Sequence, residues 1–70
     1  MWTNINQVYA SSNPQNGWAH ITADNAWHRI VPGATDGVTN VLLLLSLAKA
    51  NNRQAYVVLD SNGRITGAYM

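Results

Sequence analysis

The chain has 70 residues, no cysteine, and four cations against three acids, which leaves a net charge of +1. This composition excludes a disulfide scaffold and gives no basic surface of the kind that attracts nucleic acid or anionic membranes. No apolar run reaches the roughly 18 residues that a membrane-spanning helix needs, because Ser46 interrupts the stretch 41–48. We therefore expect a single domain that does not insert into membranes and does not favour nucleic acid as a partner.

Turn-forming clusters of Gly, Pro, Asn, Asp and Ser divide the chain into five short segments and one long one. The short segments are rich in β-branched and aromatic residues, which predicts strands. The predicted strands cover residues 5–10, 18–22, 27–31, 55–59 and 64–69.

The turn between the second and third predicted strands permits two registers. A two-residue loop at Asp24 and Asn25 places Ile21, His28 and Ile30 on one face of the hairpin. A loop with an odd number of residues instead groups Ile21 with Trp27 and Val31. The sequence leaves both registers open.

The long segment, residues 38–50, has the length and composition of a helix, with no β-branched residue after Val41. Thr35 or Asp36 is a suitable N-cap. Lys49, followed by two asparagines, suits the carbonyl end of the helix.

This predicted helix is more apolar than one packed face requires. Its apolar positions span roughly 200° of the helix surface, whereas packing on a small sheet needs a stripe of about 100° or somewhat more. Either a loop such as residues 11–17 covers the excess, or helices of neighbouring subunits shelter one another. We favour self-association, because a chain this short without disulfides or a structural metal usually needs such help. The predicted oligomer interface comprises Val41, Leu43, Leu44 and Leu47.

Asn62-Gly63 lies between the last two predicted strands and is typical of a type I′ hairpin turn. Such a two-residue turn predicts the cross-strand partners throughout the hairpin. The predicted pairs are Ser61 with Arg64, Leu59 with Thr66, Val58 with Gly67, and Tyr56 with Tyr69.

The predicted order is strand, strand, strand, helix, strand, strand. This is the order of the oligonucleotide/oligosaccharide-binding fold, in which the helix follows the third strand. We therefore predict an α+β, mostly β protein, built as a five-stranded antiparallel barrel with one leucine-rich helix between strands three and four.

The C-terminal half also resembles a known group of proteins. The resemblance is carried by VLLLLSLAKANNRQAYVVLD at residues 41–60 and GRITGAY at residues 63–69. This ending is similar to that of the pentameric B subunits of AB-type bacterial toxins, of the pertussis and subtilase-cytotoxin kind. This chain lacks the cysteine pair common in those toxins and is shorter than most of them.

The resemblance implies a ring of five copies with the helices facing a central channel. It also implies secretion or a periplasmic location, binding to cell-surface glycans, and a catalytic A subunit as partner. The sequence does not begin with a basic, then apolar, signal segment, so it reads either as a cytosolic protein or as a mature chain.

All six aromatic residues are Trp or Tyr, which combine a broad apolar ring with a hydrogen-bonding group. This combination suits stacking on a sugar ring, although packing in the core is the competing role for each residue. A two-residue turn at Asp24-Asn25 places four candidate ligand-binding residues on one hairpin face. These are Trp18, His20, Trp27 and Arg29.

Catalysis and metal binding are not expected. A Ser46, His28 and Asp36 set places the serine inside a leucine helix, without the strained turn that exposes a nucleophile. The three aspartates all occupy turn or cap positions, and His20 with His28 gives no third metal ligand. We predict a non-catalytic, oligomeric glycan-binding module without a cofactor. The alternatives are a single-stranded nucleic-acid-binding domain and an assembly protein without a ligand.

Overall fold

The computed structural model describes residues 1–12, 16–32 and 37–70 of a small α+β protein that is mostly β. This confirms the predicted class, whereas the proposed N-caps Thr35 and Asp36 lie outside the described residues. The elements are β1 (Trp2–Thr3), β2 (Ile5–Ala10), β3 (Gly17–Ile21), β4 (Ala26–Arg29), α1 (Gly37–Ala50), β5 (Ala55–Leu59) and β6 (Ile65–Tyr69).

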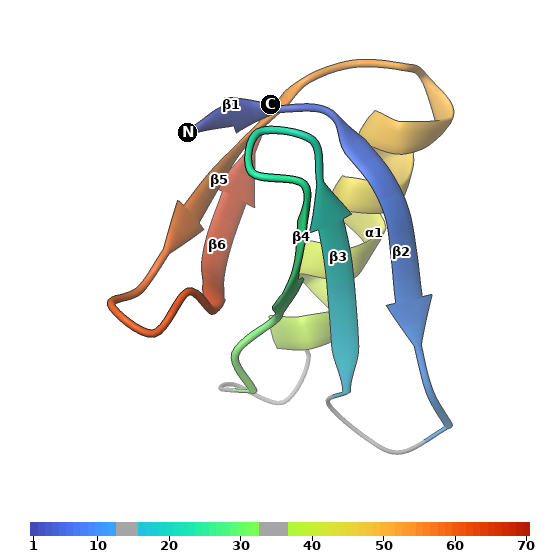
Figure 1. The fold of residues 1–70 in the computed structure, drawn as a ribbon. Coiled ribbons are helices and arrows are strands. Elements are labelled where there is room, and N and C mark those ends of the chain that lie inside the picture. The colour runs from blue at the N-terminus through green and yellow to red at the C-terminus, as the bar shows by residue number, and fades with distance from the viewer. Residues whose placement is uncertain (13–15, 33–36) are drawn as a thin grey trace.

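The strands form two antiparallel sheets of three strands, in the orders β1-β5-β6 and β2-β3-β4 (Figure 1). The predicted five-stranded closed barrel is not found among the described residues. The described residues form six strands, because a short strand, β1, which was not predicted from the sequence, precedes β2. Thr3 of β1 pairs with Ala55 of β5, whereas Ile5, on the other side of Asn4, pairs with Ile21 of β3. The two sheets also meet where Ile30, just after β4, forms a parallel bridge with Ile65 of β6.

The core lies between the sheets and α1, which packs against β2, β3 and β6. In the view of Figure 1 the helix lies behind the β2-β3-β4 sheet, so the outer face of that sheet is turned toward the viewer. The largest fully buried side chains come from both sheets and from the helix: Ile21, Ile30, Leu45, Ile65, Val57 and Thr3.

Helix α1 begins and ends within one residue of the predicted segment and directs Leu45 and Ala48 into the core. Of the predicted interface, Val41 and Leu44 are partly buried against this core. Leu43 and Leu47 are 64% and 53% exposed, so the chain's own strands do not cover this side of the helix. With 14 residues, α1 is too short to cross a membrane, and the described part of the chain has no helix that could.

In the β3–β4 hairpin, the same residues share each face as a two-residue loop would give, but the loop is longer. Ile21 pairs with Ala26 across a four-residue loop, residues 22–25, in which Asn25 has a φ of 55°. Because two and four are both even, His28 and Ile30 still share the buried face with Ile21, as the first alternative predicted.

The β5–β6 hairpin confirms the predicted pairs Tyr56 with Tyr69 and Val58 with Gly67. The type I′ turn and the pairing of Leu59 with Thr66 were wrong, because Leu59 pairs with Ile65. Only Gly63 of the predicted turn pair has a positive φ, +76°, and its N–H donates to the carbonyl of Asp60 over 3.1 Å. The loop is thus one residue longer, and a register shift between Val58 and Leu59 restores the predicted pairs further along the hairpin.

Asp60 stabilises this turn by accepting several hydrogen bonds. Its Oδ1 accepts from the backbone N–H groups of Arg64 and Asn62, each over 2.9 Å, and its Oδ2 accepts from the Arg64 guanidinium over 3.0 Å. The Arg64 backbone N–H, followed by the other donors, holds the pKa of the Asp60 carboxyl below its ordinary value. The longer turn therefore has its own network of donors in place of the expected type I′ geometry.

Candidate functional site

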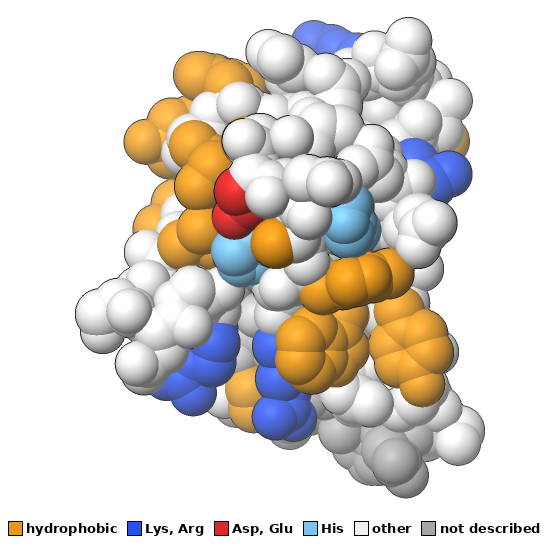
Figure 2. All heavy atoms as spheres, in the orientation of Figure 1, with side chains coloured by type: hydrophobic (Ala, Val, Ile, Leu, Met, Phe, Trp, Pro, Cys, Tyr) orange, Lys and Arg blue, Asp and Glu red, His pale blue; other side chains and the backbone are white. Residues whose placement is uncertain are grey.

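A shallow aromatic pocket lies on the outer face of the β2-β3-β4 sheet. Its volume is about 420 Å³, and its walls are the side chains of Tyr9, Trp18 and Trp27, one from each strand. Tyr9 of β2 pairs with Trp18 of β3, and Trp18 pairs with Arg29 of β4. Trp27 lies two residues before Arg29, on the same face of β4. Figure 2, drawn from the same side as Figure 1, shows hydrophobic side chains gathered over these strands. We call this site the aromatic pocket.

The three rings of the aromatic pocket do not stack on one another. Within the described residues, the ring contact in this region is between His20 and Trp27, with centroids 5.4 Å apart and planes at 76°. The Trp18 Nε1–H donates to Asn16 Oδ1 over 3.2 Å, which fixes that ring. Tyr9 and Trp27 are exposed, so apolar ring surface remains open to a ligand.

His20 and Arg29 supply polar groups beside the aromatic pocket. The amide of Asn6 donates from Nδ2 to His20 Nδ1 over 2.8 Å, so the neutral ring carries its proton on Nε2. Arg29 is exposed and has no acidic partner among the described residues, where Asp24 contacts His28 and Asp60 contacts Arg64. The His20 Nε2–H donor and the Arg29 cation therefore lie next to apolar rings.

The four predicted ligand-binding residues, Trp18, His20, Trp27 and Arg29, are thus brought onto one face, as cross-strand pairs. Tyr9 was missed as a member of the pocket. Its place depends on the register between β2 and β3, and the sequence did not predict this register. Side chains alternate between the two faces along β2, and Val8 packs inward. This alternation could have predicted that Tyr9 points outward.

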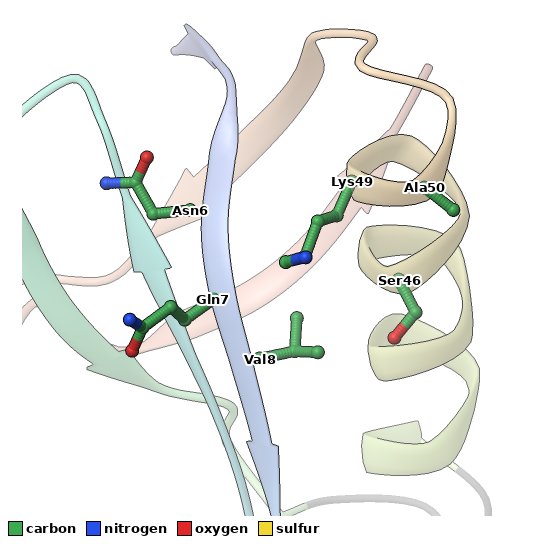
Figure 3. A pocket seen from close by; sticks show the side chains of 6 residues that line it. All are labelled: Asn6, Gln7, Val8, Ser46, Lys49 and Ala50. Carbon is green, nitrogen blue, oxygen red and sulfur yellow. The ribbon is translucent and has the colours of Figure 1, made fainter.

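A second hollow, of about 600 Å³, lies between β2 and the last turns of α1. In Figure 3, Lys49 and Ser46 point from the helix toward β2, and Val8 points toward the helix. Its other lining residues are Asn6, Gln7 and Ala50. With no aromatic side chain in its wall, this hollow offers no surface for ring stacking.

His28 is a buried side chain that joins the two sheets. Its Nε2 lies 2.7 Å from Asp24 Oδ2, and its Nδ1 lies 2.6 Å from the carbonyl oxygen of Gly63. Both ring nitrogens are therefore engaged with oxygen acceptors. Of the other members of the Ser46, His28 and Asp36 set, Ser46 lines the hollow beside β2, and Asp36 lies outside the described residues.

The two histidines do not form a metal site together. His20 lies on the outer face of the sheet opposite Trp27, whereas His28 lies on the inner face opposite Ala19. In residues 1–12, 16–32 and 37–70, no three His, Cys, Asp or Glu side chains are grouped as metal ligands.

Comparison of the chain with protein-family models, with curated proteins and with solved structures found no match. The proposals below therefore depend on the geometry of the chain itself.

Proposed function

We propose that this protein is a non-catalytic carbohydrate-binding module and that the aromatic pocket receives a sugar ring. The observation that carries the proposal is the open apolar surface of Tyr9, Trp18 and Trp27 in one shallow hollow. Exposed Trp and Tyr side chains that are not packed into a core commonly belong to recognition surfaces.

The chemistry of a sugar fits the two kinds of group in this region. One face of a pyranose ring carries C–H groups, which pack on aromatic rings, while its hydroxyls point outward and need hydrogen-bond partners. His20 Nε2–H and the Arg29 guanidinium are donors at the edge of the pocket, and Gln7, exposed on the neighbouring strand, adds a donor and an acceptor. The pocket would hold the ring, and these groups would select the hydroxyl pattern.

We further propose that the two sheets together form an oligonucleotide/oligosaccharide-binding barrel, in which only a short contact joins the sheets at each side. The bridge between Ile30 and Ile65 is parallel, and Val31 N–H donates to the Ile65 carbonyl over 2.8 Å. At the other side, Asn4 alone separates β1 from β2. Neighbouring strands then follow one another around the molecule in the order β2, β3, β4, β6, β5, β1.

Self-association through α1 completes the proposal. The toxin-like ending of the sequence further suggests a ring of five copies, secretion and a catalytic partner subunit. The supporting observation is the exposure of Leu43 and Leu47, which lie one turn apart on the same side of α1. A weak single-site interaction with a sugar would gain strength from several copies in one assembly.

A glycan array followed by titration of tryptophan fluorescence tests the sugar-binding proposal. Trp27→Ala should abolish binding of the glycan that the array identifies, because it removes one wall of the pocket. Trp2→Ala is the matched control, since Trp2 is also exposed but lies on the other sheet. A silent array, or binding that survives Trp27→Ala, would contradict the proposal.

A single-stranded nucleic acid is the second candidate ligand, because bases also stack on aromatic rings and Arg29 stands beside them. Its binding would weaken steeply as salt is added, whereas binding of a neutral sugar would not. Titration of a short oligonucleotide at low and moderate salt separates the two ligands.

A further inference from the structure

The outer face of the β1-β5-β6 sheet carries a second aromatic cluster, formed by Trp2, Tyr56 and Tyr69. Trp2 pairs with Tyr56, and Tyr56 pairs with Tyr69, so the cluster crosses all three strands. The two tyrosines stack with centroids 4.9 Å apart, and Trp2 meets them edge-on at 5.5 and 5.9 Å. Each ring thus contacts both of the others.

This packing distinguishes the second aromatic cluster from the aromatic pocket. Ring surface in the cluster is used for contacts among the three rings, whereas in the pocket it is left open. Even so, Trp2 and Tyr69 remain 52% and 53% exposed. Tightly packed but exposed Trp and Tyr side chains are typical of protein–protein contact sites.

The strands of this sheet carry no charged side chain. β1, β5 and β6 contain no Asp, Glu, Lys or Arg. Beside the aromatic cluster, Val58 is exposed and faces Gly67 across the strands. A Cβ built on Gly67 would meet no atom within 4 Å, so an open space lies above this glycine.

We propose that this face binds the same face of a second copy of the chain. A two-fold contact needs a projecting group and a space for it on one surface, because each copy must supply both. Trp2 is the projecting group, and the space above Gly67 beside Val58 receives it. A face whose strands carry no charged side chain suits a copy of itself, since neither partner buries an unpaired charged side chain.

The area of the face indicates a weak, reversible contact. A whole aromatic side chain presents about 150–250 Å², so half-exposed Trp2 and Tyr69 together offer about 200 Å² on each copy. A stable complex usually buries about 800 Å² on each partner. The contact therefore adds to association through α1 and does not replace it, and it involves neither α1 nor the aromatic pocket.

The test is Gly67→Glu, which places a charge in the receiving space without disturbing the monomer. The φ of Gly67 lies outside the left-handed region and its Cβ position is open, so the variant should fold normally. Ser61→Glu is the matched control, because it adds the same charge at an exposed residue of the β5–β6 turn, outside the strands that form this face. Far-ultraviolet circular dichroism checks the fold of both.

The readout is a series of NMR spectra recorded from low to millimolar protein concentration. In the unmodified chain and in Ser61→Glu, the Trp2 indole and Gly67 amide signals should shift with concentration, while those of Trp18 and Trp27 stay in place. Gly67→Glu should remove the shift. Concentration-independent Trp2 and Gly67 signals would overturn the proposal. Joint shifts of Trp2 and Trp27 would mean contact between two different faces, and they would also overturn the proposal. Shifts of Trp2 on adding a glycan would overturn it as well.

Discussion

His28 shows how one polar side chain can join two sheets. Its ring nitrogens face a carboxylate oxygen of Asp24 and the carbonyl oxygen of Gly63, 35 residues further along the chain. The residue is therefore a structural link between the β3–β4 hairpin and the β5–β6 turn.

We predict that His28→Ala lowers the free energy of unfolding by about 2–3 kcal/mol, because the ring is buried and one of its two hydrogen bonds is to a charged group. Urea unfolding followed by tryptophan fluorescence measures this change. His20→Ala is the control, since His20 lies on the outer face and contacts Asn6 and Trp27 there. Equal stability of the two variants would show that the His28 link contributes little.

At the scale of single elements, the two glycines of the last hairpin have different requirements. Gly63 has a φ of +76° in the turn, which an L side chain rarely adopts, whereas Gly67 lies in β6 with open space at its Cβ position. The same substitution should therefore have different effects at these two positions.

Gly63→Ala should destabilise the protein by about 1 kcal/mol, because alanine is strained at positive φ. Gly67→Ala should be neutral or slightly stabilising, since it reduces the conformational freedom of the unfolded chain without strain. Thermal unfolding of both variants provides the comparison. If both variants unfold at the same temperature, the requirement for glycine at position 63 of the turn is wrong.

At the scale of the whole molecule, a chain of 70 residues leaves part of its apolar helix uncovered. Leu45 is fully buried, whereas Leu43 and Leu47 extend away from the core. Exposed leucines on a domain of this size favour contact with other copies, because such a domain buries only about 60% of its unfolded surface alone.

Leu43→Glu and Leu47→Glu should separate the proposed assembly into folded monomers, because each places a charge at the proposed helix contact while leaving the core intact. Light scattering after size-exclusion chromatography measures the mass. Leu45→Ala is the contrasting variant and should instead cost about 3 kcal/mol of stability, as large-to-small core substitutions do. A monomeric mass for the unmodified chain would contradict assembly through α1.

Local sequence determined most elements of this protein, although it did not indicate β1 at Trp2–Thr3. The run of leucines followed by Ala48 and Lys49 predicts a helix at residues 38–50, and α1 spans Gly37–Ala50. The two strands around Asn62-Gly63 were likewise predicted within one residue at their ends. Helix and strand preferences act between near neighbours, so they can be read along the chain.

Only the tertiary structure decided how these elements meet. The even loop at residues 22–25 brought Trp18, His20, Trp27 and Arg29 together, and the β2–β3 register added Tyr9. The role of His28 likewise depends on Gly63, which is distant in sequence. Register and burial arise from contacts between remote residues, and a shift of one residue in pairing reverses the face of every side chain in a strand.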